Sequence, residues 1–339
     1  MINSPANLSD DSCASSQSAG DTAALIAYDI IMPLHVVAGL FGYTLCFIAF
    51  KKKASSDTAF AYQIMLTMSQ TVEVVTYAIY VATFYWFSGS EGRQGVTWFR
   101  ASYACMWFTA HFSFPLVNMF ISTSLLLTLA TAVDRVFALA RPFKYKDAGH
   151  TRRQLVACAC CLAAGVSTSV FDCFRSYPAL DAQLGLYHVA VDEAYTQSLT
   201  AGALAHFRNA TRIVATLVLV SCDAAMIVLY RRQMRKVDQM TSAASAETRK
   251  KNARQKVLLL LAVSESTFNF LSMTALSTYY AAVFAIPSFY KCHSHLFASI
   301  VDALVEIFDI CDFYVVFAVS KHFRQMISES VPWLKKIFT

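Results

Sequence analysis

The chain has few charged residues. Asp, Glu, Lys and Arg make up 15% of its 339 residues and hydrophobic residues make up 56%, whereas soluble domains are roughly 25% charged. The sequence also lacks a glycine-rich phosphate-binding loop and a catalytic constellation, and His293-Ser294-His295 has no further zinc ligands nearby. We therefore expect no enzyme, no metal site and no cofactor.

The first 22 residues contain no Lys or Arg. A secretory signal peptide begins with positive charge, so this segment, 1–22, which is rich in Ser, Asp and Ala, is predicted to be a disordered extracellular N-terminus. Asn7 and Asn209 each begin an Asn-x-Ser/Thr acceptor pattern for glycosylation. We expect both to lie on the outer side of a membrane.

Long apolar runs dominate the rest of the chain. A helix needs about 20 apolar residues to cross a bilayer, and seven runs are long enough. They span residues 23–50, 58–87, 102–137, 155–174, 207–230, 256–286 and 296–319. The predicted fold is an all-α membrane protein, a seven-transmembrane helix bundle over 23–319 with a short amphipathic C-terminal helix in a cytoplasmic tail, 320–339. No internal repeat or second domain is visible in the sequence.

The basic residues predict an orientation. With the N-terminus outside, 22 of the 28 Lys and Arg residues fall on the inner side, as the positive-inside rule requires. The outer ones are Arg93, Arg100, Arg175, Arg208, Arg212 and Lys291. Because the inner basic residues lie in short separate loops, they favour contact with membrane lipid or a cytosolic partner over nucleic-acid binding.

Two segments carry motifs. The third run ends in Asp134-Arg135-Val136, and Pro142 follows in a basic stretch. The last run ends in FDICDFYVVFAV, from Phe308 to Val319, and leads into a basic amphipathic segment. An acid–base pair at the end of an apolar helix indicates that this end meets water and a partner.

These segments resemble the third and seventh helices of rhodopsin-like (class A) G-protein-coupled receptors, and in particular divergent ones such as invertebrate FMRFamide-type peptide receptors or nematode chemoreceptors. The resemblance implies a plasma-membrane receptor that binds an extracellular ligand, a neuropeptide or a small chemosensory molecule, and activates a heterotrimeric G protein. Asp134, Arg135, Val136 and Pro142 would form the coupling site. The chain departs from the family at Val136, where tyrosine is usual, and at Ser272, where the family has tryptophan.

The resemblance also suggests a disulfide on the oxidising outer side. Four cysteines near that side allow three pairings. Trp98 precedes Cys105 by seven residues, a spacing common in the family, so a bridge between Cys105 and Cys173 is predicted. The family's spacing back from the coupling arginine would instead select Ala110.

Charged side chains are costly within a bilayer and are expected to face the interior of the bundle. Four acids lie on one face of the last predicted helix. A pocket for sodium or water, similar to that of class A receptors, is expected at Gln70, Glu73, Ser124, Asp309 and Asp312. The candidate ligand-pocket residues are His111, Asn118, Asn269, Ser272, Asp302 and Glu306.

Two other interpretations stay open. The polar residues could form only interhelical hydrogen bonds, or the acids could line the path of a multi-span transporter or channel. The sequence shows no paired halves, which argues against a transporter. Val117 stands where amine receptors carry aspartate and Glu306 where opsins carry lysine, so neither ligand class is expected.

Overall fold

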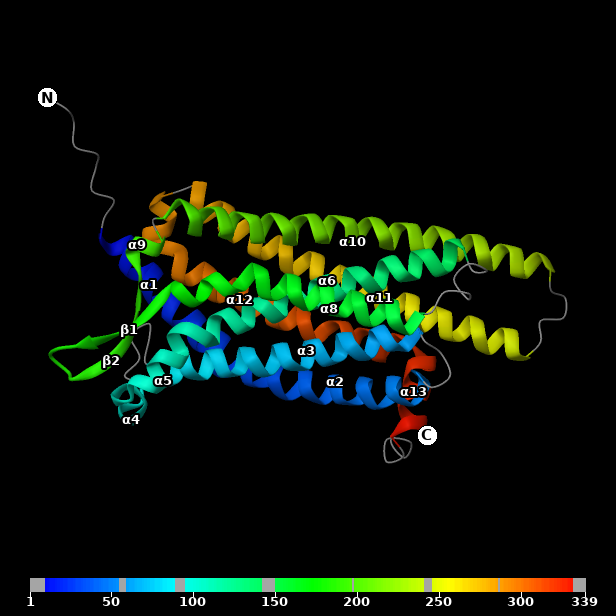
Figure 1. The fold of residues 1–339 in the computed structure, drawn as a ribbon, viewed down its shortest axis with the longest axis horizontal. Helices are drawn as coiled ribbons and strands as arrows, with labels where there is room; N and C mark the ends of the chain where they lie inside the picture. Colours follow the sequence, from blue (N-terminus) through cyan, green and yellow to red (C-terminus); the bar gives the residue numbers. More distant parts are fainter. Residues whose placement is uncertain are drawn as a thin grey trace, which may run out of the picture.

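The computed structural model describes residues 10–54, 59–88, 95–141, 150–196, 198–240, 246–285 and 287–331. Long helices run side by side along one axis (Figure 1). Within these ranges, six helical stretches are long and apolar enough to cross a membrane. They are Ser18–Lys52, Tyr62–Phe87, Tyr103–Ala140, Arg152–Phe174, His206–Arg232 and Leu259–Tyr279. The architecture is that of an all-α, multi-pass membrane protein, and six of the seven predicted runs match these helices.

The seventh predicted run lies in α12 (Pro287–Val319), which passes through the same bundle. It packs against α11 (Ala246–Ala285) and against the first helix. Its four carboxyl residues, Asp302, Glu306, Asp309 and Asp312, give it more charge within a span's length than the six helices above. A count of seven spans therefore stays a prediction.

The first helix is continuous through three segments. These are α1 (Asp10–Leu25), a π-helical segment (Ile26–Ile31) and α2 (Met32–Ala54). The structure differs here from the predicted disordered N-terminus, because residues 10–22 extend the first span as helix. Pro33 follows the π-helical segment, and since proline lacks an N–H, the preceding turn loses a hydrogen bond and widens.

The third span repeats this arrangement. α5 (Tyr103–Phe108), a π-helical segment (Thr109–Ser113) and α6 (Phe114–Ala140) follow one another without a break. Pro115 again stands just beyond the π-helical segment. Both prolines therefore mark places where a span changes its helical geometry.

Further helices complete the bundle and its connections. They are α3 (Ala59–Val81) with π-helical Ala82–Phe87, α4 (Thr97–Ala101), α8 (His150–Ser169) with 3₁₀-helical Val170–Phe174, α9 (Glu193–Thr196) and α10 (Leu199–Met240). α10 and α11 extend beyond the other helices at the end opposite α4 (Figure 1).

A β-hairpin lies between α8 and α10. Its strands β1 (Ser176–Asp181) and β2 (Leu186–Val191) pair antiparallel along their full length. The Asp181 carboxylate closes the turn by accepting the backbone N–H groups of Gln183 at 2.9 Å and Leu184 at 3.2 Å, and these donors hold the pKa of Asp181 below its usual value. The hairpin, which the sequence analysis did not predict, projects from the end of the bundle that holds α4 (Figure 1).

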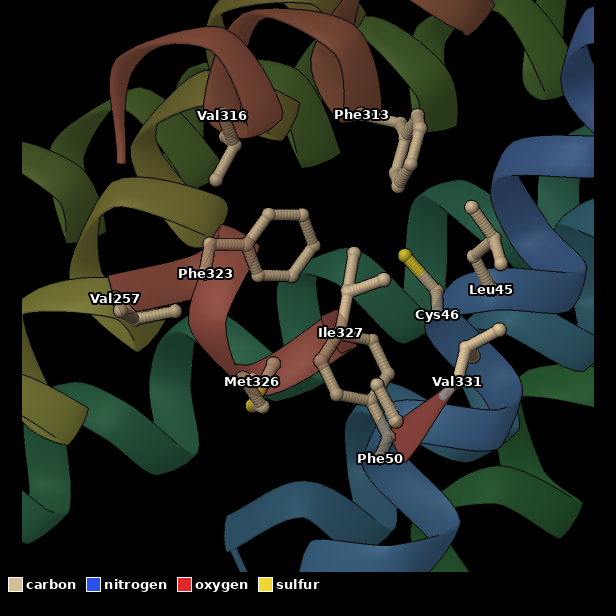
Figure 2. Packing of buried hydrophobic residues seen from close by; sticks show 11 residues of the cluster. Leu45, Cys46, Phe50, Val257, Phe313, Val316, Phe323, Met326, Ile327 and Val331 are labelled. Atoms are coloured by element: carbon tan, nitrogen blue, oxygen red, sulfur yellow. The ribbon is translucent and has the colours of Figure 1, made fainter. Parts of the chain in front are cut away.

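The amphipathic C-terminal helix predicted from the sequence is present as α13 (Lys321–Ser330). Ser320 caps its start by accepting the N–H of Phe323 at 3.2 Å. Phe323 and Ile327 are fully buried and pack with Phe50 of α2 in an apolar cluster (Figure 2). The apolar face of α13 therefore rests on the protein and ties the ends of α2 and α12 together.

Candidate functional site

Side-chain hydrogen bonds join the first helix to α12. The bonded partners are Tyr28 with the Asp302 carboxylate, His35 with the Glu306 carboxylate, Tyr43 with the Asp309 backbone carbonyl, and Tyr314 with the Ala38 backbone carbonyl. The part of the acidic face of α12 that carries Asp302 and Glu306 is therefore turned toward the first helix.

Two predicted ligand-pocket acids are engaged in these contacts. Glu306 is 4% exposed, and its Oε2 atom meets Nδ1 of the equally buried His35. Asp302 accepts the Tyr28 hydroxyl at 2.7 Å, and the Tyr28 ring stacks on Tyr85 with centroids 3.9 Å apart. A ligand would have to displace His35 or Tyr28 to reach these acids, so their ligand role stays a prediction.

The deeper polar residues converge on a cavity of about 50 Å³ between α2, α3, α6, α11 and α12. This volume has room for a few water molecules. All five residues predicted for a sodium or water pocket line it: Gln70, Glu73, Ser124, Asp309 and Asp312. The structure thus brings together side chains from three separate helices.

Two predicted ligand-pocket residues, Asn269 and Ser272, line the same cavity. Asn269 donates to the backbone carbonyl of Glu265 at 3.0 Å. The sequence prediction left Glu265 out of the site, although its carboxyl group is central to it. Its Oε1 atom accepts hydrogen bonds from Gln70 Nε2 at 3.2 Å and from Thr128 Oγ1 at 3.1 Å.

A buried arginine of α10 bonds to α6. Arg212 donates to the Asn118 side-chain oxygen at 3.1 Å and to the Ser122 hydroxyl at 3.0 Å. One turn away, Arg208 forms an ion pair with Asp172. Both arginines are predicted on the outer side, and the structure places them within α10, inside the apolar stretch His206–Arg232. The signal that could have found them is their four-residue spacing, which places both on one face of the helix.

The predicted disulfide is not formed, since Cys105 and Cys173 are both free thiols. Cys105 lies near the start of α5, where Ser102 caps its N–H. The residue that meets Cys173 is His111, whose Nδ1 atom contacts the Cys173 carbonyl oxygen. His111 adjoins Ala110, the position that spacing from the coupling arginine selects.

The predicted coupling residues lie near the end of α6, away from the hairpin (Figure 1). Asp134 and Arg135 are half-buried there. Val136 packs against the apolar cluster between α6, α10 and α11. The helix ends with the N–H of Arg141 bonded to the carbonyl of the preceding turn, and Pro142 lies outside the described residues.

The predicted glycosylation acceptor Asn209 lies in a helix and not in a loop. Asn209 lies in α10, partly buried, inside the apolar stretch His206–Arg232. A glycosylation site needs an accessible surface loop. Asn7, the other acceptor, lies outside the described residues.

A comparison with models of known protein families finds no match, and no curated protein matches the chain.

Proposed function

We propose that the chain is a signalling receptor related to the rhodopsin-like G-protein-coupled receptors. It would have seven spans, lie in the plasma membrane with its N-terminus outside, bind an extracellular neuropeptide or chemosensory molecule, and activate a heterotrimeric G protein. The observation that carries this proposal is the course of α6. This one helix supplies Asn118 to the contact with α10, Ser124 to the cavity and Arg135 to the opposite end of the bundle.

The same course suggests how a signal would travel. At 1.5 Å per residue, Ser124 and Arg135 are about 16 Å apart along α6. A ligand bound at the hairpin end would alter the packing of Asn118 on Arg212 and shift α6 against α10. Thr128, which donates to Glu265 of α11, passes this shift to α11. Packed helices switch between discrete arrangements and do not deform continuously. In the second arrangement, α11 is separated from the end of α6, and Arg135 becomes available to the G protein.

The test is a G-protein activation assay in cells that express wild type and Arg135→Ala at equal surface levels. A panel of amidated peptides and small chemosensory molecules serves as the probe, with a G-protein dissociation sensor as the readout. We expect Arg135→Ala to abolish a response that wild type gives. Arg141→Ala removes an exposed arginine just past the same helix end and should retain the response.

The orientation is tested in the same cells. An N-terminal epitope tag should bind antibody without permeabilisation, because the basic residues favour an outer N-terminus. Equal signalling by Arg135→Ala and wild type would contradict the proposal. Sodium or proton flux through proteoliposomes, without any G-protein response, would favour the transporter or channel instead.

A further inference from the structure

The central cavity gathers carboxyl groups from three helices. They are Glu73 of α3, Glu265 of α11, and Asp309 and Asp312 of α12. Among the described residues, the side chains that line the cavity include no Lys, Arg or His. Carboxylates that share so small a space repel one another strongly when ionised, because a bilayer interior screens charge weakly. The cavity therefore needs a compensating positive charge.

The groups around the cavity do not supply enough positive charge to balance its carboxylates. The titratable and charged groups of the packed helices that interact electrostatically with these acids are His35, Tyr43 and Cys46 of α2, Arg212 and Asp223 of α10, and Glu306 of α12, while α6 contributes the hydroxyls of Ser124 and Thr128. His35 is bonded to Glu306, and Asp223 adds a further acid. The acids thus outnumber the bases.

A second observation points to a ligand of the cavity. Ser272 lines it and is 2% exposed, yet its hydroxyl has no hydrogen-bond partner in the part of the chain that the structure describes. Buried hydroxyls are normally bonded to protein or to ordered water. Because the cavity is polar and large enough for water, its lining suits a hydrated site.

The geometry favours protons over a metal ion. Across the described residues, no three Asp, Glu, His or Cys side chains come together closely enough to hold one metal ion. A single sodium ion would also offset the charge of only one of the four acids. Protons bind to individual carboxyl groups and need no shared coordination sphere.

We propose that the cavity is a proton-binding site, in which its carboxyl groups and water share protons at neutral pH. Proton uptake accompanies closure of the cavity by α11 and α12, and release accompanies its opening, since removing water from carboxyl groups disfavours their charged form. Glu265 suits this role, because the two donors to its Oε1 atom leave Oε2 as the atom to carry a proton. Regulation of signalling by this site rests on the proposed receptor function, whereas the proton binding itself does not.

Infrared spectroscopy of the purified full-length protein in lipid nanodiscs tests the proposal directly. The carbonyl band of a protonated carboxylic acid is separate from the bands of a carboxylate, and exposed Asp and Glu are ionised at about pH 7. We expect wild type to show the protonated-acid band at this pH and to lose it progressively as the pH is raised. Asp312→Asn and Glu265→Gln should each lose part of the band. Absence of the band from wild type overturns the proposal, as does a band that neither substitution changes.

Asp181→Asn is the matched control, because it removes a carboxyl group of the hairpin and keeps all four that line the cavity. Its band should equal that of wild type. Replacing sodium by choline should leave the wild-type band and its pH dependence unchanged. A band that follows sodium concentration instead of pH would overturn the proposal. These measurements use neither an extracellular ligand nor a G protein, so their outcome is separate from that of the receptor assay.

Discussion

The Nδ1 atom of His35 and the carboxylate of Glu306 form a hydrogen bond in the interior of the bundle, where each residue is 4% exposed. This bond joins the first helix to α12, although 270 residues of chain separate the two positions. The other ring nitrogen of His35 has no hydrogen-bond partner in the described part of the chain. Glu306 therefore provides a specific attachment for His35 and, through it, for the first helix.

A double-mutant cycle measures this attachment. We expect His35→Ala and Glu306→Ala each to lower the free energy of unfolding by about 2–3 kcal/mol, because each leaves a buried polar partner unsatisfied. The double variant should fall short of the sum by at least about 1 kcal/mol, since the two residues lose one shared interaction. Denaturant unfolding in detergent gives these values.

A control cycle separates this coupling from a general loosening of the helix pair. Tyr314 donates to the Ala38 backbone carbonyl at 3.1 Å and joins the same two helices. Tyr314→Phe and Glu306→Ala should therefore be additive. If the effects of His35→Ala and Glu306→Ala on the free energy of unfolding were also additive, their hydrogen bond would contribute no coupling.

Gly165 of α8 lies against α6, where a side chain larger than hydrogen has no room. A Cβ atom there would lie 2.7 Å from the Met119 backbone oxygen and closer still to the Thr123 hydroxyl. We expect Gly165→Ala to lower the free energy of unfolding by about 1–3 kcal/mol, because the two helices must separate. Thr123→Ala in the same chain should restore only part of the loss, since the backbone contact remains. Full restoration would show that the hydroxyl alone sets the distance.

The hairpin turn should loosen in acid. Folding lowers the pKa of Asp181 through its two backbone N–H donors, so its contribution to the hairpin is complete above the usual value of about 4 and is lost as the pH falls through the lower folded value. Amide exchange of β2, corrected for the intrinsic effect of pH, should show this loss of protection. Asp181→Asn keeps an oxygen acceptor without a charge that titrates, so its protection should not change with pH. A wild-type hairpin equally protected throughout the acid range would contradict this account.

Most of the fold could be predicted from the sequence because a bilayer sets the length and apolarity of each span directly. α12 is the instructive exception, since the acids that identify its inner face also lower its apolarity. The helical extension that begins at Asp10 carries no apolar pattern, and the hairpin strands are short and contain Pro178. Such segments take their structure from the packed bundle beside them, which local composition does not reveal.

The candidate site was predictable to a similar degree. Polar residues within apolar helices must face one another, and this reasoning selected the five pocket residues that now line the cavity. Their basic neighbours were missed, because the rotation of each helix about its axis decides whether His35 or Arg212 points inward. Spacing within one helix does not determine that rotation relative to another.

Arg212 is the residue whose substitution tests this inward rotation most sharply. Its Nε atom and one terminal nitrogen both donate to the Ser122 hydroxyl. The same terminal nitrogen also donates to the Asn118 side-chain oxygen. Lysine keeps the charge but has a single nitrogen and no planar fork. We expect Arg212→Lys to lower the free energy of unfolding by about 1–3 kcal/mol, because buried acceptors on α6 lose their donors. Arg231→Lys, an exposed position on the same helix, should leave stability within about 0.5 kcal/mol of wild type. Equal stability of both variants in thermal unfolding would mean that Arg212 does not hold α10 against α6.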